Sequence, residues 1–273
     1  MKHLTKLILI AMIGILSLML VTGCSDDDSS TNAVTAGDLS SPSYASGRGQ
    51  ADARLDDMFT SLSRGMGNLG GWNPPPLRAE PVDSSDSGYD SETGWWYNYN
   101  LYEYEDAIIW ESDSVRFTTA GEFTEEPDST TDKMEFKYYD GLTGTLYIPD
   151  STFEDSIAID LDGYFWNAWA FSDLQSDTLT INGYGGEDFD MTFDGEEYSE
   201  TFTETYSNVK IFIENVYPHA GTISTTMNIY ALYGGEFGQL TFTLTVTFYD
   251  LYYHVYMTDG SYYWEWDEEW PEG

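Results

Sequence analysis

The chain has 273 residues, which is long enough for one sizeable hydrophobic core, and a formal net charge of −38 at pH 7. A surface this acidic repels phosphate backbones, so nucleic acid is excluded as an expected partner. The single cysteine excludes internal disulfides and cysteine-based zinc sites, so burial of apolar side chains must stabilise the fold.

The N-terminal segment has the pattern of a targeting signal. Lys2 and Lys6 give it positive charge, and the apolar run "LILIAMIGILSLML" follows over residues 7–20. This run is shorter than the roughly 20 residues that a helix needs to cross a bilayer core. It therefore predicts the apolar region of a signal peptide over residues 1–23.

The lone cysteine stands directly after that run. Val21, Thr22 and Gly23 precede Cys24, so one branched apolar residue and two small ones come before the cysteine. These four residues resemble the lipobox of a bacterial type II signal peptide. The resemblance covers residues 1–24 only, and it implies cleavage before Cys24, lipid on Cys24, and a membrane as the partner of that lipid.

The alternative is a free or core cysteine behind an uncleaved peptide. Ser25 stands where aspartate, in some Gram-negative groups, signals retention at the inner membrane, so the sequence favours an outer-membrane lipoprotein.

Three segments lead from the cysteine to the main domain. Residues 24–50 are rich in Ser, Asp, Thr, Ala and Gly and predict a disordered tether. Residues 51–66 predict a short amphipathic helix, used for core packing or, alternatively, for docking a partner. Residues 67–92 are rich in Gly, Pro and Ser and predict an irregular linker. The apolar helix positions are Leu55, Met58, Phe59 and Leu62, with Gly65 as the stop.

Residues 93–273 predict a single all-β domain. In "LTFTLTVTF", residues 240–248, apolar residues alternate with threonines, which indicates a strand with one buried face. Weaker alternation recurs around Ile159, Ile211 and Ile223. Five dipeptides predict hairpin turns, namely Asp140-Gly141, Asp162-Gly163, Asn182-Gly183, Asp194-Gly195 and Asp259-Gly260.

These signals predict about twelve antiparallel strands in a meander. So many strands seldom stay in one flat sheet, so we expect a barrel or half-barrel with the helix against its concave side, or alternatively a β-sandwich.

Residues with catalytic or metal-binding chemistry are few. His219 and His254 are isolated, no G-x-S-x-G motif is present, and the glycines of "NGYGGED" (residues 182–188) open no helix and so predict a turn. The sequence predicts no cofactor and names no catalytic pair. A structural calcium ion is the alternative, with Asp160 and Asp162, or Glu187, Asp188 and Asp190, as ligands.

Aromatic residues are abundant, with 9 Trp, 22 Tyr and 14 Phe, and such residues are expected first to fill the interior of an antiparallel sheet. In "GWWYNYNLYEYE" they occupy both alternating faces of a strand, with Trp95, Tyr97 and Tyr99 on one face and Trp96, Tyr102 and Tyr104 on the other. An exposed aromatic row is a platform for sugars, and a covered row lines a lipid pocket.

The sequence therefore predicts a membrane-anchored, non-enzymatic envelope lipoprotein that binds an unidentified ligand or protein partner. The alternatives are a hydrophobic-ligand carrier and a carbohydrate-binding or glycoside-acting protein.

Overall fold

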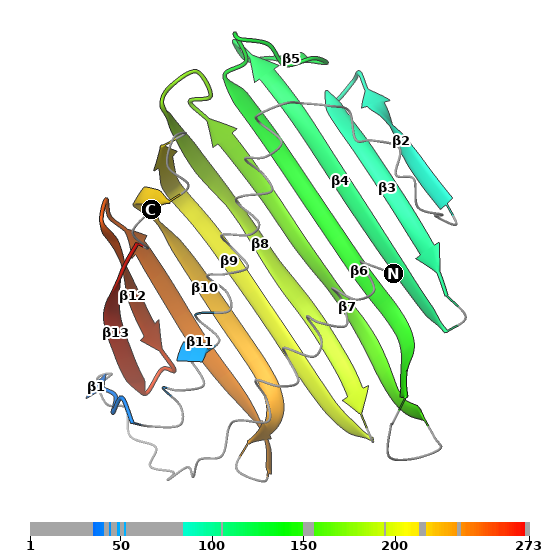
Figure 1. Cartoon of the computed structure of the whole chain (residues 1–273), viewed down its shortest axis with the longest axis vertical. Coiled ribbons are helices and arrows are strands. Elements are labelled where there is room, and N and C mark those ends of the chain that lie inside the picture. The colour runs from blue at the N-terminus through cyan, green and yellow to red at the C-terminus, as the bar shows by residue number, and fades with distance from the viewer. Residues whose placement is uncertain are drawn as a thin grey trace.

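The described part of the chain forms one β-sheet. A computed structural model describes residues 35–40, 44, 48–49, 52, 84–104, 106–149, 156–193, 195–212, 217–233 and 236–270. Its 13 strands lie side by side in a single twisted sheet (Figure 1). In chain order they are β1 (Thr35–Ala36), β2 (Ser84–Asp90), β3 (Trp95–Glu103), β4 (Ala107–Thr119), β5 (Glu122–Thr124), β6 (Lys133–Pro149), β7 (Ser156–Ser172), β8 (Thr178–Phe193), β9 (Glu196–Phe212), β10 (Pro218–Tyr233), β11 (Glu236–Phe248), β12 (Tyr252–Thr258) and β13 (Tyr262–Glu269).

The strand order follows the chain, which confirms the antiparallel meander. Across the sheet the order is β1-β13-β12-β11-β10-β9-β8-β7-β6-β4-β3-β2, with β5 paired to β4. All ladders are antiparallel except the two-residue parallel pair of β1 with β13, beside which the Gly37 amide donates to the Tyr263 carbonyl (2.8 Å). Twelve strands thus belong to the meander, as the sequence predicts.

The predicted closure into a barrel or half-barrel is wrong. Closing a meander requires the first and last strands to pair, whereas β2 and β13 lie at opposite ends of the strand order and the sheet is neither closed nor strongly curled (Figure 1). The edge of β13 that faces away from β12 pairs with β1 instead. The sandwich alternative is also wrong for the described residues, because all their strands share one sheet.

Side-chain alternation gives the sheet two different faces. On β11, Phe242, Leu244, Val246 and Phe248 are at most 2% exposed, and the threonines between them point the other way. We call the face of Phe242 the inner face and the face of Thr243 the outer face. Cross-strand pairs such as Met227 with Phe242 carry the inner face from strand to strand.

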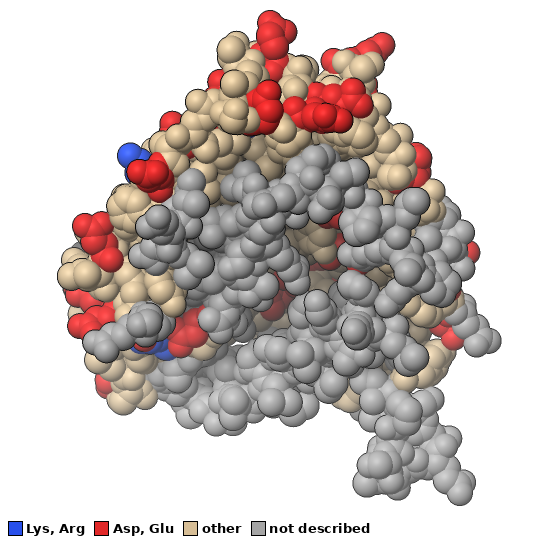
Figure 2. All heavy atoms as spheres, turned by 45° about the horizontal axis from the view of Figure 1, so that its top comes forward, with Lys and Arg blue, Asp and Glu red and all other residues tan. Residues whose placement is uncertain are grey.

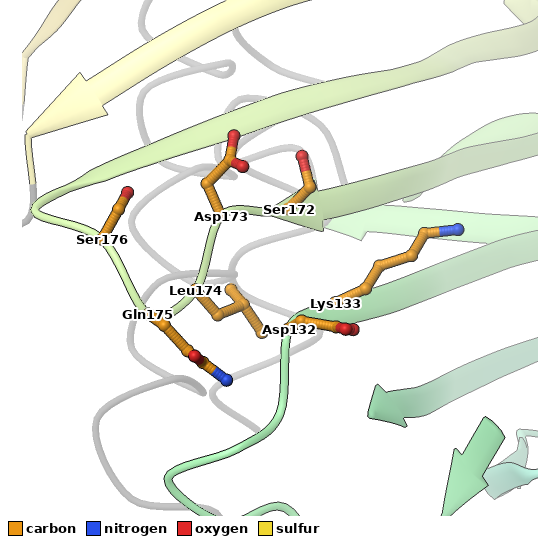
Figure 3. A pocket seen from close by; sticks show the side chains of 7 residues that line it. All are labelled: Asp132, Lys133, Ser172, Asp173, Leu174, Gln175 and Ser176. Atoms are coloured by element: carbon orange, nitrogen blue, oxygen red, sulfur yellow. The ribbon is translucent and has the colours of Figure 1, made fainter. Parts of the chain in front are cut away.

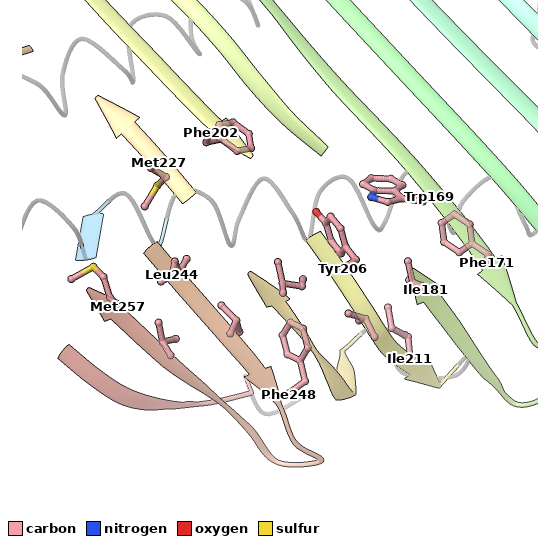
Figure 4. Packing of buried hydrophobic residues seen from close by; sticks show 14 of the residues in the cluster. Trp169, Phe171, Ile181, Phe202, Tyr206, Ile211, Met227, Leu244, Phe248 and Met257 are labelled. Atoms are coloured by element: carbon pink, nitrogen blue, oxygen red, sulfur yellow. The ribbon is translucent and has the colours of Figure 1, made fainter. Parts of the chain in front are cut away.

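Two apolar clusters lie on the inner face. The larger cluster reaches from β4 to β13, and Figure 4 shows its side chains projecting from neighbouring strands toward one side. The smaller cluster lies toward the opposite ends of β3, β4, β6, β7 and β8 and contains Tyr102, Ala107, Ile109, Leu142, Ile159, Leu161 and Met191. The burial of Tyr102 also shows that the second aromatic face of β3 is a covered one at that position.

Two predicted hairpin turns are confirmed. Gly195 connects β8 to β9 and Gly260 connects β12 to β13, and both have positive φ angles (81° and 88°). In the second turn the Asp259 carboxylate accepts hydrogen bonds from the amides of Ser261 (2.9 Å) and Tyr262 (2.7 Å). Such turns need residues that tolerate left-handed backbone conformations.

The other three turn predictions are wrong, because Asp140-Gly141, Asp162-Gly163 and Asn182-Gly183 lie inside β6, β7 and β8. A Cβ atom on Gly141 would lie 2.2 Å from Cε2 of Trp110, and one on Gly163 would lie 2.6 Å from Cδ2 of Phe189. These glycines make room for an aromatic ring from the neighbouring strand. The strands are consequently longer than expected, up to 17 residues.

The sheet includes segments that the sequence assigned elsewhere. β2 lies within the predicted linker and β1 within the predicted tether, so the sheet begins before Thr93. The predicted helix over 51–66 lies outside the described residues except for Asp52. Within the described ranges, no helix is long and apolar enough to cross a bilayer.

Acidic side chains far outnumber basic ones on the visible described surface. Figure 2 shows Asp and Glu side chains in several separate groups, with very few Lys or Arg side chains among them.

Candidate functional site

The outer face carries a continuous group of aromatic side chains, which we call the outer aromatic patch. Strand register brings its members together across five strands. Tyr99 and Tyr139 lie on either side of Ser112 in one cross-strand row, and Tyr139 pairs directly with Trp166 in the same row. Four strand spacings of about 4.8 Å make the patch about 19 Å wide. It consists of Tyr97 and Tyr99 on β3, Trp110 on β4, Tyr139 on β6, Tyr164 and Trp166 on β7, and Tyr184 on β8.

Glycines let two indole rings of the patch lie close to the backbone. Gly141 of β6 lies under Trp110, and Gly186 of β8 lies under Trp166, where an added Cβ would come within 2.3 Å of Cζ2. A ring seated over a neighbouring glycine lies along the sheet rather than standing away from it. The patch therefore presents ring faces, and not only ring edges, to the outside.

The patch is accessible at several positions. Tyr97, Tyr164 and Tyr184 are 37%, 46% and 58% exposed. Tyr164 and Trp166 have their ring centroids 5.1 Å apart with an interplanar angle of 28°. Exposed large aromatic groups in a contiguous set are unusual on a protein surface and indicate a binding surface.

Carboxylates border the patch on one side. Asp188 pairs directly with Tyr164, and the neighbouring pair joins Asp162 to Asp190. Burial raises the pKa of Asp190 above its ordinary value, and the negative charges of Asp188 and Asp162 raise it further. These groups supply hydrogen-bond acceptors and make this border strongly negative.

Basic residues border the patch on the other side, near Trp95. The Arg116 guanidinium and the Lys137 ammonium lie 4.6 Å and 4.5 Å from the ring centroid of Trp95. Arg116 Nε also donates to Glu135 (2.8 Å). Burial acts to raise the pKa of Glu135, but hydrogen bonds from Arg116 and Lys133 outweigh it, so this pKa lies below its ordinary value.

The inner face carries a second unusual feature, an inner polar band that lies between the two apolar clusters on β4 to β7 and reaches into the larger cluster at Glu204 of β9. Register aligns its members across β3 to β9, so that Asp113 pairs with Tyr138 and Asp140 with Glu111. Several members are almost fully buried, including Asn100 (4% exposed), Asn167 (2%) and Glu204 (7%). The band comprises Asn98, Asn100, Glu111, Asp113, Tyr138, Asp140, Asn167, Glu187 and Glu204.

Hydrogen bonds order parts of this band. Tyr206 donates its hydroxyl proton to Glu204 Oε1 (2.6 Å), and Tyr138 donates to Asp140 Oδ2. Burial, followed by the charge of Asp140, raises the pKa of Tyr138 above its ordinary value. Tyr138 is therefore a neutral hydrogen-bond donor and not a base.

Gly185 keeps space open within the band. A Cβ atom at this position would lie 2.0 Å from Asn167 Oδ1 and 2.8 Å from Glu204 Oε1. Asn167 Oδ1 has no hydrogen-bond partner within the part of the chain that the structure describes. A buried, acceptor-rich band of this kind favours cationic or hydrogen-donating groups.

The residues singled out by the sequence are scattered. Cys24 lies outside the described residues. His254 Nδ1 lies 2.8 Å from Asp267 Oδ1 on the outer face, and His219 stacks on Phe212 with centroids 3.9 Å apart. Neither histidine belongs to the aromatic patch or the inner polar band.

The two candidate sets of calcium ligands differ in placement. Asp160 and Asp162 both lie on the outer face of β7, whereas the set of Glu187, Asp188 and Asp190 is divided between the two faces of β8. Asp188 and Asp190 lie on the outer face with Asp162, whereas Glu187 lies on the inner face. Among the described residues no three acidic or histidine side chains are arranged to hold a metal ion. The glycines of "NGYGGED" lie within β8, so the prediction of a turn there is wrong.

A shallow pocket lies at one end of the sheet. Its volume is about 460 Å³, and its lining comes from the start of β6 and the loop between β7 and β8 (Figure 3). Around it, Asp173 accepts a hydrogen bond from Thr180 (2.6 Å), which ties the loop to β8. The lining residues are Asp132, Lys133, Ser172, Asp173, Leu174, Gln175 and Ser176.

Sequence reasoning missed the inner polar band. A signal was present, because Glu204 occupies an inward position between Phe202 and Tyr206, where alternation predicts another apolar residue.

Comparison of the chain with protein families, with curated proteins and with solved structures finds no match in any of the three.

Proposed function

We propose that this protein is a lipid-anchored lipoprotein of the bacterial outer membrane that binds a neutral glycan on its outer aromatic patch, without catalysing a reaction. The observation that carries the binding proposal is the exposure of Tyr97, Tyr164 and Tyr184 within a contiguous aromatic set. The anchor rests on the lipobox residues that end at Cys24.

A glycan matches the chemistry of the patch. The apolar faces of sugar rings stack on Tyr and Trp rings, and the sugar hydroxyls need acceptors close by. Asp188, next to Tyr164, supplies such an acceptor. A net charge of −38 repels anionic polymers, which favours a neutral glycan.

The hydrophobic-carrier alternative has weaker support. A lipid pocket needs a continuous apolar lining, whereas the inner polar band runs between the two apolar clusters and includes the buried carboxylates of Glu111 and Glu204. Desolvating carboxylates against acyl chains is unfavourable.

The anchor is tested by metabolic labelling of cells with an alkyne-tagged fatty acid. We expect label on the wild-type protein and on the control Ser29→Ala, and none on Cys24→Ala, which should also leave the membrane fraction. Equal labelling of Cys24→Ala would overturn the anchor.

Glycan binding is tested by titrating the purified protein with neutral cell-envelope polysaccharides. We expect Tyr164→Ala and Tyr184→Ala each to weaken binding about 10-fold, the value of one lost stacking contact. Tyr230→Ala is the matched control, because Tyr230 is also on the outer face and 40% exposed but lies on β10, away from the patch. Equal loss in all three variants, or no binding by the wild type, contradicts the proposal.

A further inference from the structure

Two rows of outer-face residues run across the sheet from β3 to β12. Strand register aligns them, because each residue stands beside its partner on the next strand. One row runs from Tyr97 through Tyr184 to Tyr256, and the row beside it runs from Tyr99 to Thr258. We call these two rows the cross-strand strip.

The strip has two chemically different halves. On β3 to β8 it contains most of the outer aromatic patch. On β9 to β11 every residue of the strip is threonine or serine, and Tyr184 pairs directly with Thr205, so this half continues the patch. We call the second half the hydroxyl field, and it consists of Thr203, Thr205, Ser224, Thr226, Thr243 and Thr245.

The strip is nearly free of charge. Lys137 is the only charged residue in either row, although the chain contains 48 Asp and Glu residues. Threonine is favoured in strands, which accounts for its presence. This preference does not account for the lack of acid, since the outer face of β13 carries Glu265, Asp267 and Glu269. An uncharged strip on so acidic a protein suits a neutral ligand.

The hydroxyl field is accessible to such a ligand. Thr203, Thr205 and Ser224 are exposed, and the other members are half-buried. A hydroxyl group both donates and accepts hydrogen bonds, so it can pair with either role of a sugar hydroxyl. The χ1 angle of threonine is already restricted by its branched Cβ, so ordering it on binding costs little entropy.

The dimensions of the strip select the direction of the ligand. Eight strand spacings separate β3 from β12, which makes the strip about 38 Å long at about 4.8 Å each, twice the width of the aromatic patch. Along the strands it is short, because charged residues border it on both sides. These are Glu135, paired with Arg116, on one side and Asp188 on the other. A long neutral chain therefore fits across the strands and not along them.

We propose that the ligand of the outer face is an extended neutral polysaccharide that lies across the strands. One stretch stacks on the outer aromatic patch, and the next stretch is hydrogen-bonded to the hydroxyl field. This inference rests on the proposed glycan function, and it adds the direction, the length and a second contact surface of the ligand.

Fragments of two lengths test the inference. The full lipoprotein, in a detergent without a sugar headgroup, is titrated calorimetrically with fragments of the neutral cell-envelope polysaccharide that it binds. Their lengths are about 20 Å and about 40 Å, to match the patch and the whole strip. We expect the long fragment to bind at least about 10-fold tighter, because it adds hydrogen bonds to the field. Equal affinities overturn the inference and leave the proposed function standing, whereas no binding of any polysaccharide overturns both.

A matched pair of variants on β11 tests the hydroxyl field directly. Thr243→Glu places a carboxylate inside the field, and Gln239→Glu places the same group on the same face of the same strand, outside both rows. Thr243→Glu should weaken the long fragment about 10-fold and leave the short one unchanged, because a buried carboxylate displaces the contacts of the field. Gln239→Glu should leave both affinities unchanged, and Tyr164→Ala in the patch should weaken both.

A milder variant keeps the test decisive if Thr243→Glu does not fold. Thr226→Val preserves the branched shape and removes one hydroxyl, so it should weaken only the long fragment, by about 3-fold or more. Equal effects of Thr243→Glu and Gln239→Glu contradict the inference. A dimer that native mass spectrometry detects in the wild type but not in Thr243→Glu, without any dependence on fragment length, assigns the field to self-association instead.

Discussion

Along β11, Phe242 and Leu244 point to the inner face and are 1% exposed, whereas Thr241 and Thr243 point to the outer face. The two faces share every strand, yet they differ in what they contact. The inner face combines apolar clusters with buried carboxylates, and the outer face combines threonines with exposed aromatic rings. Alternation therefore tells which side chains share a face, but the chemistry of each face depends on what lies against it.

The largest expected difference between the faces is in core packing. Phe242→Ala should lower the free energy of unfolding by about 3–5 kcal/mol, because it leaves a cavity in the larger cluster. Thr243→Ala, on the adjacent outward position, should lower it by less than about 1 kcal/mol. Urea unfolding followed by tryptophan fluorescence measures both, and similar losses would contradict the assignment of faces.

A smaller difference is expected for glycines. Gly185→Ala forces a methyl group against Asn167 and Glu204 of the inner polar band, and should lower the free energy of unfolding by about 2 kcal/mol. Gly238→Ala in β11 meets no atom within 4 Å and should change it by less than about 0.5 kcal/mol. The same urea titration measures both variants. An unchanged free energy of unfolding in Gly185→Ala would mean that the inner polar band can accommodate the added methyl group.

The hydroxyl of a buried tyrosine should matter less. Tyr206→Phe removes the hydrogen bond to Glu204 and should lower the free energy of unfolding by about 1–2 kcal/mol. Tyr184→Phe, at a tyrosine that is 58% exposed, serves as the control on the outer face. Thermal unfolding midpoints of the two variants measure the difference. Equal midpoints would mean that the buried hydroxyl of Tyr206 contributes no more to stability than the exposed hydroxyl of Tyr184.

The smallest effect concerns acid pairs on the outer face. The pKa of Asp190 is raised, so its ionisation destabilises the folded state as pH rises above the ordinary value of 3.8. Because Asp190 is exposed, solvent screens these charges, so Asp190→Asn should raise the stability at pH 7 by no more than about 0.5 kcal/mol. No gain is expected below pH 3, where the carboxyl is protonated in both states. Thermal unfolding at both pH values checks this, with Asp177→Asn in the β7–β8 loop as the control; a gain that persists at pH 3 argues against a charge effect.

Local pattern predicted the strands well and their assembly poorly. The alternation at 240–248 identified a strand and both of its faces, because period two is a property of the strand itself. The Asp-Gly dipeptides at Gly141 and Gly163 predict turns, but these glycines make room for the rings of Trp110 and Phe189. Those rings come from neighbouring strands, so the local sequence does not reveal this role. Whether the sheet closes into a barrel could not be predicted either, since each hairpin has the same local sequence signals in an open sheet and in a barrel.

The candidate sites follow the same division. The double-faced aromatic pattern around Trp96 and Tyr97 was visible in the sequence, and the structure adds that Tyr97 is exposed while Tyr102 is buried. The inner polar band was not found, because Asn100, Glu111 and Glu204 are far apart in the chain and only cross-strand register aligns them.

In the proposed lipidated protein, the two-residue pairing of β1 with β13 limits how far the domain can stand from the membrane. Eleven Cα steps separate Cys24 from Thr35, and they span at most about 40 Å. A tether that ran from Cys24 to Gln50 would span at most about 90 Å. In the proposed lipidated protein, the β13 edge is thus the side held nearest the bilayer. The β2 edge, beside Tyr97 and Tyr99, is the one free to point away from the membrane and toward a ligand.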